Sequence, residues 1–251
     1  MKYTYFIVLF LGCLATTWSQ TPQKRMQSAN EAYQRDDFGA AIRDYEALVS
    51  EGFVSVALYH NLGNAYYKIG QPGKAALYYH RGLRLRPGDK GLQDNLSLIR
   101  ASFDDPITPL PDFFLFRYWK QTQLWLGTNG WASVGLILIW LGFAGLWRWR
   151  AAPEREQRKK AFLIGLISLL LSGLPLSLSW SAHRYQHDAR QAVVVEEPVS
   201  FHQGADAQSP VLRDLPPGVS FRVLDQIGAW YKVRLVNGDT GWVKEEGFIR
   251  V

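Results

Sequence analysis

Two long runs without a charged residue constrain this chain more than any other feature. No Lys, Arg, Asp or Glu occurs in residues 121–147 or in residues 161–182. A helix that crosses the ~30 Å hydrocarbon layer of a bilayer needs about 20 residues, and each run supplies that length. The sequence therefore predicts two transmembrane helices. The alternative is a pair of core helices, but no other segment is long and apolar enough to cover them on all sides.

The connection between the two runs predicts their orientation. Residues 148–160 carry six Lys and Arg residues and two Glu. The outer flanks of the runs carry fewer basic residues, which are Arg117, Lys120, Arg184 and Arg190. Short loops rich in Lys and Arg stay in the cytoplasm, so both tails of the hairpin should lie across the membrane.

The N-terminus is typical of a secretory signal peptide. Lys2 provides the positive start, an apolar core follows, and Thr17-Trp18-Ser19 is a suitable cleavage site. We expect residues 1–19 to be removed and the next domain to be exported, in agreement with the loop charge. A lipid attachment site at Cys13 is the alternative, which its early position disfavours. Cys13 is the only cysteine, so cleavage would exclude disulfides, zinc–thiolate sites and cysteine nucleophiles.

Residues 20–103 contain a repeat with a period of 34. The positions that match across this offset include Asn30 and Asn64, Ala41 and Ala75, and Tyr45 and Tyr79. The second unit resembles a tetratricopeptide repeat, in which small residues such as Gly63 and Ala75 let two helices approach closely and Tyr66 and Tyr79 fill the space between them. A further stretch with Leu92, Leu96 and Ile99 at helical spacing predicts a capping helix.

The resemblance implies a groove, lined by the first helix of each repeat, that binds a peptide or another protein. By register, Asn30, Gln34, Asn64 and Lys68 should face this groove. The alternative for any one of these side chains is an ordinary solvated helix position.

A stiff, proline-rich linker and an interfacial segment occupy residues 104–120. Pro106, Pro109 and Pro111 stiffen the linker. The aromatic and basic residues of 113–120 are typical of a segment that lies in the membrane interface.

Residues 191–251 predict a small all-β domain. Strands are expected at 193–195, 220–224, 230–235 and 241–243, with a hairpin turn at Asn237-Gly238. The order of these elements resembles bacterial SH3-like domains. That resemblance implies a non-catalytic domain that binds cell-wall or protein ligands.

Three aromatic residues of this domain are candidates for ligand contact. Trp230 and Trp242 fit a core position better than a ligand platform, and Tyr231 is expected to be exposed and to be the better contact residue.

No motif in the sequence indicates catalysis, a cofactor or a metal. His183 and His187 have the spacing of two metal ligands on a helix, but zinc would need a third ligand that is not visible nearby. No phosphate-binding loop, nucleophile elbow or paired-carboxylate motif is present. The pI of about 9.4 reflects the crowded basic loop rather than a basic domain face, which argues against nucleic-acid binding.

The order of modules resembles the BatE-like family of the bacterial aerotolerance (Bat) operon. The fold class is thus helical repeats, two transmembrane helices and a C-terminal SH3-like barrel. The resemblance implies a non-enzymatic scaffold in the inner membrane, with both soluble domains in the periplasm. Its implied partners are membrane proteins with von Willebrand A domains and a MoxR-type ATPase. The alternative function is a receptor for peptidoglycan that acts through the SH3-like domain.

Overall fold

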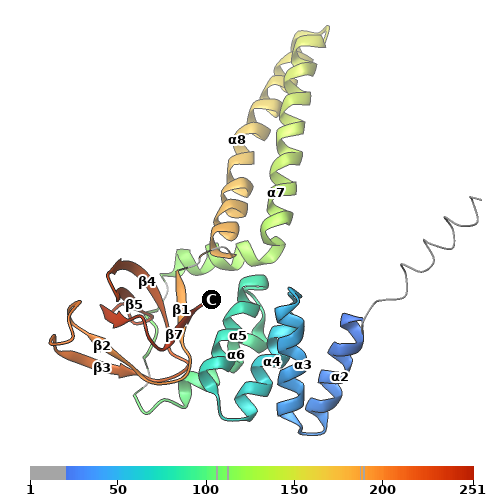
Figure 1. Cartoon of the computed structure of the whole chain (residues 1–251). Helices are drawn as coiled ribbons and strands as arrows, with labels where there is room; N and C mark the ends of the chain where they lie inside the picture. Colours follow the sequence, from blue (N-terminus) through green and yellow to red (C-terminus); the bar gives the residue numbers. More distant parts are fainter. Residues whose placement is uncertain (1–20, 106, 112, 187, 189) are drawn as a thin grey trace, which may run out of the picture.

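The computed structural model describes residues 21–251, with the exception of 106, 112, 187 and 189. The expected signal peptide at 1–19, with Cys13, lies outside these residues. Figure 1 shows the helical repeats and the β-domain side by side at one end of a long two-helix hairpin. The helices are α2 (Pro22–Gln34), α3 (Phe38–Ser50), α4 (Val56–Lys68), α5 (Pro72–Leu85), α6 (Lys90–Ala101), α7 (Phe114–Ala151) and α8 (Arg155–Gln186). The strands are β1 (Gln191–Val194), β2 (Val199–His202), β3 (Val211–Leu215), β4 (Ser220–Ile227), β5 (Trp230–Leu235), β6 (Thr240–Lys244) and β7 (Phe248–Arg250).

Helices α2 to α6 form the repeat region. Asp37, Ser55 and Asp89 cap three of them, each accepting a hydrogen bond from the main-chain N–H three residues further on. Proline begins α2 and α5, where its missing N–H leaves no helical bond unmade. Gly63 brings α4 and α5 together as expected, because a Cβ atom there would lie 2.4 Å from the Tyr79 ring.

The β-domain is one antiparallel sheet in the order β3-β2-β6-β5-β4-β1-β7. The four expected strands correspond to β1, β4, β5 and β6, whereas the short strands β2, β3 and β7 were not predicted. The turn at Asn237-Gly238 joins β5 to β6. Gly238 adopts φ 91°, a left-handed conformation that favours glycine.

Strand β1 and the adjoining Val195 belong to two hydrophobic cores at once. Ala192 and Val194 pack inside the β-domain, whereas Val193 and Val195 pack against the repeats. Side chains alternate between the two faces of a strand, so both faces of β1 are buried. Burial of each valine contributes about 1.5–3 kcal/mol to this association.

Strand β1 runs alongside α5 in the opposite direction. Lys74 near the start of α5 pairs with Glu196 at 3.6 Å, and His80 one and a half turns later contacts Gln191, with 2.9 Å between Nδ1 and Nε2. Burial, and then the charge of Arg100, lower the pKa of His80 to about 4. The imidazole is therefore neutral near pH 7, and its Nδ1 accepts the Gln191 hydrogen bond.

Arg84 joins the repeats to two other segments. Its Nε donates a hydrogen bond to the Gln186 carbonyl at the end of α8, at 2.9 Å, and its Nη1 donates to the main-chain oxygen of Val251. One side chain on α5 thus contacts both the C-terminal end of α8 and the C-terminal residue of the β-domain.

Helices α7 and α8 form the apolar hairpin. At Gly127 (φ 64°, ψ −175°) α7 changes direction, so residues 114–126, here called the foot segment, lie across the base of the hairpin (Figure 1). The expected span 121–147 therefore begins within the foot segment. Higher up, a Cβ atom at Gly145 would lie 2.6 Å from the Cα atom of Gly165, which is the close approach that small residues permit between membrane helices.

The length and composition of both hairpin helices would allow them to cross a membrane. Only 11% of the most apolar window of α7 and 28% of that of α8 are buried. The apolar side chains thus face outward, which does not fit the alternative of two core helices in a soluble protein.

The contact between α5 and β1 generates a prediction with an internal control. A methyl group at Gly73 would lie 2.0 Å from the Val195 carbonyl oxygen, whereas at Gly39, the same position one repeat earlier, the nearest atom would be 3.8 Å away. We expect Gly73→Ala to lower the free energy of unfolding by about 1–3 kcal/mol. Gly39→Ala should be neutral or raise it by up to about 1 kcal/mol, because alanine favours a helix. Chemical unfolding of the purified protein measures both, and equal effects would contradict the importance of this contact.

Candidate functional site

A ladder of hydrogen bonds links the first helices of successive repeats. Asn30 Oδ1 accepts hydrogen bonds from the Tyr45 hydroxyl at 2.6 Å and from Asn61 Nδ2 at 2.9 Å. Tyr45 lies on α3 and Asn61 on α4, so the half-buried Asn30 on α2 connects three helices.

The same arrangement recurs 34 residues later. Asn64 Oδ1 accepts hydrogen bonds from the Tyr79 hydroxyl at 2.8 Å and from Asn95 Nδ2 at 2.9 Å. Asn95 lies on α6 at the position that Asn61 has on α4. Helix α6 therefore takes the place of the first helix of a further repeat and extends the surface formed by α2 and α4.

The four residues predicted to face the groove fall into two pairs. Asn30 and Asn64 are half-buried members of the ladder, and their carboxamide oxygens already accept two hydrogen bonds each. Gln34 and Lys68 follow one helical turn later on the same helix face and are exposed. Gln34 and Lys68 are therefore the pair available for partner contacts, and that role stays a prediction.

The β-domain reverses the expected exposure of its aromatic residues. Tyr231 is only 6% exposed, packs edge-on against Phe248, and donates a hydrogen bond to Glu245 at 3.0 Å. Trp230 and Trp242 are partly exposed and lie outside the core. The expectation that Tyr231 is exposed is wrong because alternation along β5 turns Tyr231 inward and its neighbour Trp230 outward.

The outer face of the sheet gathers aromatic and basic side chains into what we call the tryptophan face: His202, Trp230, Lys232 and Trp242. Trp242 on β6 lies opposite both His202 and Lys232, and directly opposed residues share a face. The His202 ring meets Trp230 edge-on at 5.0 Å, and the Lys232 ammonium lies 6.0 Å from the centre of the Trp242 ring. Such a surface suits stacking on planar or sugar groups.

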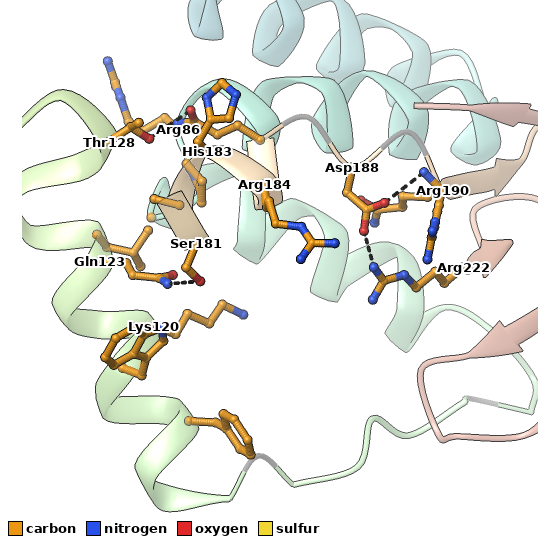
Figure 2. A pocket seen from close by; sticks show the side chains of 18 of the residues that line it. Arg86, Lys120, Gln123, Thr128, Ser181, His183, Arg184, Asp188, Arg190 and Arg222 are labelled. Atoms are coloured by element: carbon orange, nitrogen blue, oxygen red, sulfur yellow. Dashed lines mark hydrogen bonds and ion pairs between the residues drawn. The ribbon is translucent and has the colours of Figure 1, made fainter. Parts of the chain in front are cut away.

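A third candidate is a cleft of about 1300 Å³ where the repeats, the hairpin and the β-domain meet, which we call the junction cleft. Among the described residues that line it, Asp188 is the only carboxylate, against six basic side chains. These are Arg86, Lys120, Arg184, Arg190, Arg222 and Arg234. Figure 2 shows Lys120 and Arg184 extending toward the open middle, with Asp188, Arg190 and Arg222 on the β-domain side.

This cleft was not predicted from the sequence. Lys120, Arg184 and Arg190 were expected only to flank the apolar runs as basic residues. Arg222 and Arg234 lie on strands β4 and β5, and no local pattern relates them to residues a hundred positions earlier.

The described residues contain no group of three His, Cys, Asp or Glu placed to hold a metal ion. His183 lines the junction cleft. His187, its expected companion, lies outside the described residues.

Comparison with known proteins identifies both soluble modules. A family model described as the tetratricopeptide repeat matches residues 56–89, and one described as the bacterial SH3 domain matches residues 198–249. The chain thus combines a tetratricopeptide repeat region, two long apolar helices and an antiparallel SH3-like domain. Both matched families are non-catalytic binding modules, and they imply protein partners.

The remaining comparisons add little. No curated protein matches the chain. The crystal structure of MamA protein is 16% identical, with 65% of this chain and 87% of that chain covered, at a TM-score of 0.32. A likeness that low carries no argument about fold or function.

The division of the groove residues into two pairs generates a prediction. Asn64→Ala removes the oxygen that accepts hydrogen bonds from the Tyr79 hydroxyl and from Asn95 Nδ2, which then keeps only its contact with His60 Nε2. The substitution should therefore lower the free energy of unfolding by about 1–3 kcal/mol. Lys68→Ala, one turn away and exposed, should change it by less than about 0.5 kcal/mol. Chemical unfolding compares the two variants. An Asn64→Ala protein of unchanged stability would mean that the ladder does not hold the repeats together.

Proposed function

We propose that this chain is a membrane-anchored scaffold of the bacterial envelope that binds other proteins through its repeat groove and performs no catalysis. Its two matched modules are binding domains, and the exposed Gln34 and Lys68 line the face that such repeats use for partners. The finer assignment is a Bat-type complex, with von Willebrand A-domain membrane proteins and a MoxR-type ATPase as partners. It rests on the order of the modules.

The observation that carries the scaffold proposal is the joining of both modules to the foot of one hairpin. Strand β1 is shared with the repeat core, and Arg84 contacts the end of α8 as well as Val251. Both soluble modules lie at the same end of the hairpin (Figure 1). In either orientation, therefore, the repeat groove and the tryptophan face lie on one side of the membrane.

The membrane anchor has separate support. The outward apolar surface of the hairpin needs an apolar environment, and the tight glycine contacts between α7 and α8 are typical of membrane helices. The basic loop 148–160 lies at the end away from the soluble modules, which favours a cytoplasmic loop and periplasmic domains.

A second candidate function is favoured by the tryptophan face. The partly exposed Trp230 and Trp242, next to His202 and Lys232, form a platform of the kind that stacks on sugars and peptides. The chain would then act as a receptor for peptidoglycan, with the SH3-like domain as the ligand-binding module.

Topology is the first prediction to test. Single cysteines at Ser50, Gln157 and Asp239, in a Cys13→Ala background, place one exposed thiol on the repeats, the loop and the β-domain. After the outer membrane is permeabilised, a membrane-impermeant maleimide should label Ser50→Cys and Asp239→Cys but not Gln157→Cys. Labelling of Gln157→Cys alone would place both domains in the cytoplasm and exclude the peptidoglycan function.

Three surface variants separate the two candidate functions. A photo-crosslinking residue at Lys68 should capture von Willebrand A-domain membrane proteins, identified by mass, whereas the same residue at the exposed Arg43 on α3 should not. Trp230→Ala with Trp242→Ala should leave that capture intact. Loss of co-sedimentation with purified peptidoglycan in the tryptophan variant, without specific capture at Lys68, would favour the receptor instead.

A further inference from the structure

We propose that the junction cleft binds the phosphate headgroup of an anionic phospholipid. The inference rests on the proposed membrane anchor and goes beyond it, because it assigns a specific lipid site to the soluble side of the hairpin. Three properties of the cleft carry the argument: unpaired positive charge, its level along the hairpin, and an apolar wall.

The first property is positive charge without a partner. Within the described part of the chain, Lys120, Arg184, Arg190 and Arg234 form no ion pair with a carboxylate. Asp188 is already engaged, since its Oδ2 accepts a hydrogen bond from Arg222 Nη2 at 2.5 Å. The cleft therefore keeps a strong net positive charge that favours a bound anion.

The second property is the position of the cleft at the foot of the hairpin. Its lining includes Ser181 at the end of the apolar run of α8, Arg184 just after that run, and Gly127 at the kink of α7. The Arg184 guanidinium lies 5.0 Å from the centre of the Trp180 ring, the aromatic residue at the end of that run. If the hairpin spans the bilayer, these residues lie at the level of the lipid phosphates.

The third property is the composition of the α7 wall. Phe116, Trp119 and Leu124 of the foot segment line the cleft and are 70%, 37% and 37% exposed. On the same segment Gln123 Nε2 donates to Ser181 Oγ at 2.6 Å, which holds the wall against α8. Polar and cationic groups thus meet exposed apolar side chains along one surface.

These properties match a molecule with a phosphate at one end and acyl chains at the other. A soluble phosphate would use the arginines but leave the aromatic wall exposed to water. An acidic peptide of a partner protein would have to enter at the membrane surface, at the level where the lipid headgroups already lie if the hairpin spans the bilayer. An anionic phospholipid accounts for the charge, the position and the apolar wall together.

The test uses the full chain purified in a neutral detergent and two triple variants. Lys120→Gln/Arg184→Gln/Arg190→Gln removes three exposed cleft charges, and Arg150→Gln/Arg155→Gln/Lys160→Gln removes three exposed charges at the other end of the hairpin. Native mass spectrometry measures binding of added dioleoyl phosphatidylglycerol and, as a neutral control, dioleoyl phosphatidylcholine. We expect the cleft variant to weaken the tightest phosphatidylglycerol adduct by about 100-fold and the loop variant to retain it.

Several outcomes would overturn the proposal. Equal phosphatidylglycerol binding by the wild type and the cleft variant would exclude the site. Displacement of phosphatidylglycerol by millimolar inorganic phosphate would assign the cleft to a soluble anion. A photo-crosslinking residue at Trp119 that captures a protein rather than a lipid in cells would assign it to an acidic partner. Because binding in detergent does not depend on orientation, a failed topology test would not by itself produce any of these results.

Discussion

Strand β1 and the adjoining Val195 pack against both soluble modules. Val193 and Val195 lie in the core of the repeats, and Ala192 and Val194 lie in the core of the β-domain. Strand β1 cannot leave the β-domain, because its other face is part of the core of that domain. Separating the two modules would therefore expose Val193 and Val195 to water. Modules joined by small polar interfaces are expected to move relative to one another, but a strand buried on both faces removes that freedom. The repeat groove, the tryptophan face and the junction cleft therefore keep fixed relative positions. All three depend on the absence of a side chain at Gly73, where the main chain of β1 approaches α5.

The asparagine ladder changes how the repeat surface is interpreted. Asn30 and Asn64 are identical across the 34-residue period because each has the same structural task, which is to accept hydrogen bonds from a tyrosine and from the next repeat. A repeated polar residue thus serves the geometry of the stack. Under the proposed function, partner specificity is assigned to positions that differ between repeats, such as Gln34 and Lys68. One of these is neutral and the other charged, so they give the two ends of the groove different chemistry.

The elements with a strong local period could be predicted from the sequence, and the contacts between modules could not. The apolar runs, the 34-residue repeat and the Asn237-Gly238 turn each carry their signal within a short window. The expected exposure of Trp230 and Tyr231 was wrong because both faces of β5 carry an aromatic residue. The residue types alone could not decide which face of the strand points inward. Gly73 occupies the same repeat position as Gly39, and only the docked β-domain distinguishes them. The junction cleft was missed because it exists only after three distant segments are assembled.

The charges at the two ends of the hairpin have different origins. In the proposed topology, the six basic residues of 148–160 act during insertion by keeping a short loop in the cytoplasm. Lys120, Arg184 and Arg190 lie close enough to the apolar runs to oppose that orientation, so orientation does not explain why they are present. Arg222 and Arg234 belong to a folded domain and contribute little to orientation, yet they line the same cleft. These basic residues weaken the orientation signal, yet they lie on one surface of the folded protein. Their presence therefore needs an explanation from the folded structure. An anion held at the foot of the hairpin supplies that reason, because it would compensate the repulsion among these five basic side chains, of which only Arg222 has a carboxylate partner among the described residues.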